Sequence, residues 1–423
     1  MRSDWFKAHP QVKLCTSVPV LAWAFYDFAN TIWALNILSL YFPLWVVQDM
    51  EAKQSTLSIT LSSSMLLVAI VSPALGAVSD QTGKRLQFLA SAVLITVICT
   101  VLFGLPHKLG FTLGLFIIAN FAYQSGNVFY DSLLTTISRF EIRGTVSGLG
   151  VAFGYVGSFA GIILIAPIAS NWGRVSTFMP TGIAFLLFSL PCYLFIKETP
   201  SGKGLSVNLL KESYVQIYQT IRQHSQHINL FRFIAARFLY VDAINTLLVF
   251  MAIYLTEVIG FNDSTIRVLL LTSASSAIIG SFLYGRLTDY LGPKNTLFII
   301  LAQWIVVFIG LAATSSPLFI WVIGFLTGTA LGGTWTADRT LLTRLAPPSQ
   351  IGEFFGLYQL AGKFAAVIGP LIWGVTVESL VELGDMRFRI AILALLINVV
   401  LGLLTLTLVK LPTKQPNGLD NID

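Results

Sequence analysis

The chain carries the stretch Gly76-Ala-Val-Ser-Asp-Gln-Thr-Gly-Lys-Arg85 and, further on, the related stretch Gly285-Arg-Leu-Thr-Asp-Tyr-Leu-Gly-Pro-Lys294. Both follow apolar segments long enough to cross a membrane. A second polar phrase occurs twice inside such segments, as Asp27-Phe-Ala-Asn-Thr31 and as Asp242-Ala-Ile-Asn-Thr246. Two signatures repeated in the same order predict two related halves. Repeated halves of this size in a membrane are typical of secondary transporters, whose substrate site lies where the halves meet.

The composition also indicates a membrane protein. Of the 423 residues, 55% are hydrophobic and 11% are charged, whereas a soluble protein has about 25% charged residues. The mean hydropathy is +0.77. Lysines and arginines concentrate in alternate connections, so the positive-inside rule predicts that both termini are cytoplasmic. The net charge of +6 is therefore a signal of topology, and we expect no nucleic-acid partner.

Twelve windows of about 20 mostly apolar residues predict twelve transmembrane helices. The fold class that follows is an all-α membrane protein with two pseudo-symmetric six-helix halves. We expect the N-terminal half over residues 1–196, a cytoplasmic linker over residues 197–229 and the C-terminal half over residues 230–423.

The linker itself is predicted to hold a short amphipathic helix. Its apolar side chains recur at helical spacing, at Leu210, Tyr214, Ile217, Tyr218 and Ile221. Such a helix is typical of a segment lying on the inner membrane surface. We interpret it as a tether between the two halves, with a docking site for a partner as the alternative.

The two repeated loops resemble the signature loop of the major facilitator superfamily, and the resemblance covers the whole twelve-helix chain. It implies that Asp80, Asp289 and their basic neighbours form a conformational latch rather than a substrate site. It also implies that one arginine after the fourth helix and one after the tenth are their partners. The residues of this predicted latch are Asp80, Lys84, Arg85, Arg139, Asp289, Lys294 and Arg344.

A narrower resemblance is to the vacuole-effluxer-like branch of that superfamily, which includes autophagy-related vacuolar amino-acid exporters. The stretches that carry it are Trp23-Ala-Phe-Tyr-Asp-Phe-Ala-Asn30, Phe238-Leu-Tyr-Val-Asp242, Gly332-Gly-Thr-Trp-Thr-Ala-Asp-Arg339 and Gly352-Glu-Phe-Phe-Gly356. The resemblance implies export of an amino acid. Asp131 and Asp338 add acidic groups to the family pattern, so the substrate preference is expected to differ from that of the best-known member.

Ionisable side chains inside the spans define the candidate site. Each costs roughly 2.5–3.5 kcal/mol to insert, so each is a functional hypothesis by default. Lys363 falls near mid-bilayer and needs a carboxylate or a water-filled cavity, and Asp242 or Asp338 could provide the carboxylate. Together with Arg339 it is also a candidate to bind the carboxylate of a substrate. The predicted substrate or proton site comprises Asp27, Asn30, Asn127, Asp131, Asp242, Asn245, Trp335, Asp338, Arg339 and Lys363.

Plainer interpretations exist for several of these residues. Asn30, Asn245 and the helix-4 amides Asn120 and Gln124 suit hydrogen bonds between helices. Asp338-Arg339 suits a local structural pair. Trp335 suits packing or anchoring at the membrane interface.

The function predicted from the sequence is secondary active transport of a small polar metabolite, an amino acid above all, by alternating access with a coupling proton and in the direction of export. A multidrug or siderophore exporter is the alternative within transport. A lipid scramblase or a non-transporting sensor is the alternative from another class. No nucleotide-binding, zinc-protease or serine-hydrolase motif occurs, so we expect no enzyme, cofactor or metal. We expect a monomer in the inner membrane of a bacterium, with a eukaryotic vacuole as the alternative.

Replacing Asp27 or Asp242 with Asn tests proton coupling. If either carboxylate carries the coupling proton, its variant loses accumulation driven by a pH gradient but keeps exchange, because an amide cannot take up that proton. Both activities are measured in proteoliposomes, with and without the gradient. Unchanged accumulation in both variants would refute coupling through these residues.

Overall fold

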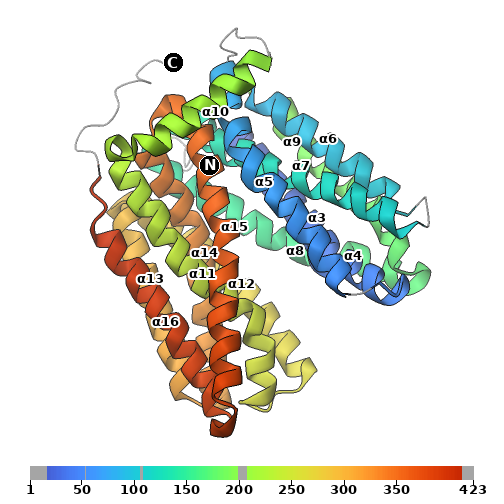
Figure 1. Cartoon of the computed structure of the whole chain (residues 1–423), viewed down its shortest axis with the longest axis vertical. Helices are drawn as coiled ribbons and strands as arrows, with labels where there is room; N and C mark the ends of the chain where they lie inside the picture. The colour runs from blue at the N-terminus through green and yellow to red at the C-terminus, as the bar shows by residue number, and fades with distance from the viewer. Residues whose placement is uncertain (1–16, 53, 105–107, 199–206, 412–423) are drawn as a thin grey trace, which may run out of the picture.

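The computed structural model describes residues 17–52, 54–104, 108–198 and 207–411, and those residues form helices joined by short connections (Figure 1). Ten of the described helices are long and apolar enough to cross a membrane. Two further long helices, α7 and α15, complete the set of twelve. Helix α7 is continuous, but polar side chains such as Asn120, Gln124, Asn127 and Asp131 lower its hydropathy.

The first half contains α3 (Val18–Trp33) with its continuation through η1 (Ala34–Leu40), α4 (Tyr41–Leu44) and η2 (Trp45–Asp49), then α5 (Gln54–Thr82), α6 (Arg85–Leu102), α7 (Leu109–Ile137), η3 (Phe140–Ile142), α8 (Arg143–Trp172), η4 (Arg174–Thr177) and α9 (Phe178–Phe195). The first predicted helix therefore contains two π-helical segments, which its apolar pattern does not reveal. The linker contributes α10 (Val207–Arg222) and η5 (His224–His227).

The second half contains α11 (Ile228–Glu257), α12 (Asp263–Leu291), α13 (Pro293–Ala313), α14 (Pro317–Leu345), η6 (Pro348–Gln350), α15 (Ile351–Ser379), η7 (Val381–Leu383) and α16 (Met386–Thr407). Pro293 and Pro317 stand in the first turn of α13 and α14, where the missing N–H has no helical partner to lose. The side chain of Asn262 caps α12 by accepting a hydrogen bond from the backbone N–H of Thr265 at 2.9 Å.

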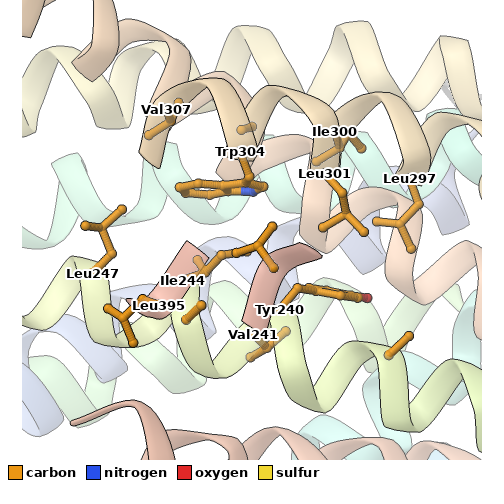
Figure 2. Close-up of a cluster of buried hydrophobic side chains, with 14 of the residues drawn as sticks. Tyr240, Val241, Ile244, Leu247, Leu297, Ile300, Leu301, Trp304, Val307 and Leu395 are labelled. Atoms are coloured by element: carbon orange, nitrogen blue, oxygen red, sulfur yellow. The ribbon is translucent and has the colours of Figure 1, made fainter. Parts of the chain in front are cut away.

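Each half has its own apolar core. The core of the first half is built from helices α3 to α9. The core of the second half lies among its own helices, with Val128 of α7 added from the first half. Figure 2 shows part of this second core, where Tyr240 and Ile244 of α11 lie opposite Leu301 and Trp304 of α13. Separate cores allow each half to move as a unit.

The halves meet mainly where α5 packs on α15 and α8 packs on α12. We call the end of the molecule at which α10 lies the linker end, and the opposite end the far end. The two bundles are closest at the linker end and diverge toward the far end (Figure 1). At the linker end a Cβ added to Gly76 would lie 2.2 Å from the carbonyl oxygen of Gly352, and one added to Gly148 would lie 2.2 Å from that of Ser281. These contacts therefore need glycine.

We predict that Gly76→Ala opens the linker end, because its methyl group cannot fit against the backbone of Gly352. The measurement is the distance between spin labels at Ser170→Cys in the first half and Glu382→Cys in the second, both at the far end. The far-end distance shortens in the variant. Gly114→Ala is the matched control, since a Cβ there meets nothing within 4 Å. Equal distance distributions for the two alanine variants would contradict the prediction.

Candidate functional site

The predicted latch lies at the linker end and joins the two halves reciprocally. Asp289 of the second half accepts hydrogen bonds from the backbone N–H groups of Gly144 at 2.6 Å and Thr145 at 2.7 Å, at the start of α8. Asp80 of the first half accepts one from the backbone N–H of Glu353 at 3.1 Å, at the start of α15. The first N–H groups of a helix lack helical partners and carry partial positive charge. Each half thus places a carboxylate on a helix N-terminus of the other.

The arginines predicted for the latch have different surroundings. Arg85 forms an ion pair with Asp80 at 2.7 Å, within its own loop. Arg344 of the second half stacks on the ring of Phe140 in the first half, 4.3 Å from its centre. Arg139 is exposed and takes part in none of the ion pairs found among the described residues. The expected pairing of Arg139 with the latch is therefore not seen, because Arg85 already neutralises Asp80.

The lysines of the predicted latch lie beside it. Lys84 immediately precedes α6, where its backbone carbonyl accepts from the N–H of Phe88 at 3.2 Å. The ammonium of Lys294 donates to the carbonyl oxygens of Thr407 at 3.2 Å and Val409 at 2.5 Å. Lys294 therefore binds the end of α16 in its own half.

Deeper in the bundle, one arginine joins the halves. Arg339 on α14 forms ion pairs with Asp27 on α3 at 3.4 Å and with Asp131 on α7 at 3.2 Å. We call these three residues the inter-half triad. Gln359 on α15 donates a hydrogen bond to Asp131 at 2.9 Å. The side chains of Arg339 and Asp27 are 9% and 15% exposed, so the triad is nearly buried but borders accessible space at Asp27.

A second buried ion pair lies next to the triad, within the second half. Arg237 on α11 donates to Asp338 at 3.1 Å, and the Tyr240 hydroxyl donates to the same carboxylate at 2.5 Å. The Arg237 guanidinium also lies 3.6 Å from the centre of the Tyr358 ring. The interpretation of Asp338 and Arg339 as a local pair is wrong, since neighbouring residues on a helix point about 100° apart.

Arg237 is a site residue that the sequence reasoning missed. Its signal was available, as an arginine inside the apolar segment that precedes Tyr240. With all groups ionised, the carboxylates of Asp27, Asp131 and Asp338 face the guanidiniums of Arg237 and Arg339. Three negative charges against two positive ones leave a formal charge of −1 in this described cluster. An uncompensated negative charge in a nearly dry setting favours uptake of a proton or a cation.

Aromatic rings support the triad from the first half. The rings of Trp23 and Tyr130 stack with their centres 4.5 Å apart, and Tyr26 stacks on Tyr130 at 4.6 Å. The indole N–H of Trp23 donates to the Tyr130 carbonyl at 3.0 Å. The guanidinium of Arg339 lies 5.5 Å from the Trp23 ring, within the range of a cation–π interaction. These rings fix the wall against which Arg339 rests.

Asp242 occupies a different place from its sequence counterpart Asp27. Its carboxylate accepts hydrogen bonds from the backbone N–H of Gly369 at 2.7 Å and from Asn398 at 3.2 Å. Gly369 precedes Pro370 inside α15, where proline interrupts the helical hydrogen bonds. Asp242 thus joins α11 to the interrupted turn of α15, and the structure does not bring it to the triad.

The remaining predicted asparagines differ in their surroundings. Tyr123 donates to the backbone carbonyl of Asn30 at 3.4 Å, while the side-chain oxygen of Asn30 is buried without a hydrogen-bond partner among the described residues, and Asn127 lies near Tyr123. Asn120 donates to the Ser64 hydroxyl on α5 at 2.7 Å, which makes it a link between two helices of one half. Asn245 is half-buried on α11.

Trp335 and Lys363 complete the predicted set. Trp335 lies near Tyr155 of α8, which belongs to the other half, and the centre of the Trp335 ring is 6.0 Å from the guanidinium carbon of Arg237. Tyr155 lines an apolar cavity of about 150 Å³, whose wall also includes Leu248, Met251, Leu269 and Leu331. Lys363 belongs to α15, and its side chain lies outside the described part of the structure. Among the described residues, no group of three or more His, Cys, Asp or Glu side chains is arranged to hold a metal ion.

The comparison with protein families agrees with this architecture. A model of the family described as vacuole effluxer Atg22 like matches residues 50–415. The chain belongs to the Atg22-like family. It is 26% identical to an uncharacterized MFS-type transporter, YxiO, of Bacillus subtilis (strain 168), over 92% of this chain and 94% of that protein. It is 24% identical to autophagy-related protein 22 of Coccidioides immitis (strain RS), over 63% of this chain and 49% of that protein.

Solved structures of the major facilitator superfamily share the fold of this Atg22-like chain. The human organic anion transporter MFSD10 superposes with a TM-score of 0.72 at 15% identity, covering 94% of this chain and 99% of MFSD10. The proton:xylose symporter XylE superposes with a TM-score of 0.73 at 14% identity, covering 93% and 96%. The predicted fold class and family are confirmed. The chain is a multi-pass membrane transporter of this superfamily and not an enzyme.

We predict that Arg339→Ala lowers the free energy of unfolding by about 3–5 kcal/mol, because it leaves two nearly buried carboxylates without their cation. The measurement is denaturant-induced unfolding of the protein in detergent micelles. The triple variant Arg339→Ala, Asp27→Asn, Asp131→Asn recovers much of the loss, since amides need no counter-charge. A single variant as stable as the parent, or a triple variant no better than the single, would contradict this account.

Proposed function

We propose that this Atg22-like chain is a secondary active transporter that exports an amino acid by alternating access. The observation that carries the proposal is the inter-half triad, in which a guanidinium of one half is bound by two carboxylates of the other. An amino acid offers both signs of charge. Its ammonium group competes with Arg339 for Asp27 and Asp131, and its carboxylate competes for the guanidinium. Substrate binding would therefore loosen the ion pairs that hold the halves together.

The charge of the described cluster supports coupling to a proton. A formal charge of −1 leaves one carboxylate without a full counter-charge. Asp27 is the candidate proton carrier, because it is the most exposed of the triad at 15%. Asp242 is less suited, since it is 1% exposed and already satisfied by Gly369 and Asn398. Lys363 remains a candidate for the substrate carboxylate.

The orientation of the chain follows from its positive charges. We propose that the linker end faces the cytoplasm of a bacterial cell, with both termini on that side, and that the protein acts as a monomer. The conformation described here, with its halves closest at the linker end, would then be the one that releases an exported substrate outside. The latch residues Asp80 and Asp289 would stabilise this conformation by holding helix N-termini of the opposite half.

A multidrug exporter is the second candidate function. The apolar cavity beside Tyr155 supports it, because lipophilic cations are bound by apolar and aromatic walls. Among relatives, the multidrug resistance protein MdtG of Dickeya zeae (strain Ech586) is 23% identical over 85% of this chain and 87% of that protein. The inter-half triad favours the amino acid, because a lipophilic cation could take over Asp27 or Asp131 but offers no carboxylate for the Arg339 guanidinium that it would displace.

We predict counterflow of amino acids in proteoliposomes. Liposomes loaded with one unlabelled amino acid accumulate the same labelled compound, because exchange through the site needs no gradient of ions. Liposomes without protein give the background. Gly114→Ala, whose added methyl group meets nothing within 4 Å, is expected to transport like the parent and controls for losses during purification and reconstitution of a variant. Accumulation of a labelled lipophilic cation instead would favour the multidrug exporter. No accumulation of any amino acid by folded protein would overturn the proposal.

A further inference from the structure

The side chains of helix α10 form three faces, whereas an ordinary amphipathic helix has one apolar and one polar face. At 100° per residue, Ser213, Gln216, Ile217 and Thr220 share the face that packs on the protein. A second face carries the exposed polar residues Glu212, Gln219 and Arg222, with one exposed apolar residue, Val215, among them. The third face carries Tyr214, Tyr218 and Ile221, which are 43%, 64% and 50% exposed.

This arrangement reverses the usual one for a helix in water. The protein-facing side of α10 is mainly polar, with Ser213 at 0% and Thr220 at 6% exposure, while two tyrosines and an isoleucine face away. A helix between protein and water would bury the apolar side chains and expose the polar ones. Three faces about a third of a turn apart suit a helix that touches protein, lipid and water at once.

The apolar face of α10 continues the lipid-facing surface of a membrane helix. The Tyr214 hydroxyl donates a hydrogen bond to the carbonyl oxygen of Ile70 on α5 at 3.4 Å. Ile70 is 55% exposed, and Leu66 on the preceding turn is 58% exposed. Exposed aliphatic side chains on a spanning helix face lipid. Tyrosine is favoured where the hydrocarbon meets the phospholipid headgroups, and Lys211 on α10 is exposed to reach their phosphates.

The protein-facing side of α10 reaches both halves of the molecule. The Gln216 amide donates to the carboxylate of Glu353 on α15 at 2.5 Å and accepts from Gln81 on α5 at 2.8 Å. Gln81 follows Asp80, and Asp80 binds the backbone N–H of Glu353. One side chain of the linker therefore bridges the same two helices that the latch holds. Figure 1 shows α10 lying across the linker end near α5 and α15.

We propose that α10 is a membrane-anchored strap across the latch. Tyr218 and Ile221 seat in the headgroup layer of the leaflet at the linker end, Tyr214 reaches along α5 to Ile70 within the hydrocarbon, and this seating holds Gln216 between Gln81 and Glu353. Opening the linker end separates α5 from α15, so Gln216 must give up one of its two partners. The lipid leaflet thereby stabilises the conformation in which the linker end is closed, and an anionic leaflet does so more strongly because of Lys211.

The first test measures where the faces of α10 lie. Single nitroxide labels are placed at Tyr218→Cys and, as the matched control on the water face, at Gln219→Cys, in full-length protein whose three native cysteines are replaced. In phosphatidylglycerol nanodiscs, the label at position 218 is relaxed by oxygen and the label at position 219 by a water-soluble nickel complex. Equal accessibility of both labels to the nickel complex would overturn the anchoring.

The second test measures the conformation directly and needs no transported substrate, so it stands apart from the proposed function. Spin labels at Ser170→Cys and Glu382→Cys report the far-end distance. Gln216→Ala lowers the ratio of linker-closed to linker-open protein by about threefold or more, as expected for the one hydrogen bond that Gln216 gives up when the linker end opens. Gln219→Ala leaves the ratio unchanged. An unchanged ratio in Gln216→Ala would overturn the strap.

The third test measures how the linker-closed fraction depends on lipid composition. Replacing phosphatidylglycerol with phosphatidylcholine lowers the linker-closed fraction in the parent and has little further effect in the double variant Tyr218→Ser, Ile221→Ser. If both proteins respond equally, the lipid acts elsewhere and the proposal fails. If position 218 is in water until a soluble protein is added, the face binds a protein partner and the proposal likewise fails.

Discussion

Arg339 of the second half is nearly buried between Asp27 and Asp131 of the first half, and this pairing governs how the two halves can be arranged. Removing one partner from a buried ion pair costs far more than the pair contributes, because the remaining charge has neither water nor a counter-ion. The three residues come from α14, α3 and α7, so the pairing sets the relative position of helices in both halves. Any ligand that takes over part of this pairing changes the energy of their arrangement.

Two further sets of contacts join the halves at the linker end, namely the latch with its glycine contacts and the Gln216 bridge. In the latch, carboxylates accept short hydrogen bonds from the N–H groups at helix N-termini. Glycines such as Gly76 and Gly352 allow the helices of the two halves to come into backbone contact there. Such contacts are lost over a small separation, so they favour a two-state interface rather than gradual opening. The Gln216 bridge adds a contact of the same kind from the linker.

The pseudo-symmetry of the sequence is not kept in the chemistry. Asp27 and Asp242 occupy matching phrases, yet Asp27 faces an arginine of the other half while Asp242 binds the backbone before Pro370 in its own half. A repeated motif thus specifies a repeated helix and leaves each side chain free to take a separate role. The positive charge of the site also lies in one half, on Arg237 and Arg339.

The spans and most of the buried ionisable residues could be read from the sequence, because insertion into lipid imposes a long apolar run and penalises each charge within it. The two halves and the family resemblance came from the repeated polar phrases and motifs, and Arg237 was missed. The sequence also indicated Asp80 and Asp289 through their repeated loops. Only the tertiary structure decided the partners. Asp338 pairs with Arg237 and not with its neighbour Arg339, because adjacent residues on a helix point in different directions. The pairing of buried charges depends on which helices lie side by side, and the hydropathy of the sequence does not predict those neighbours.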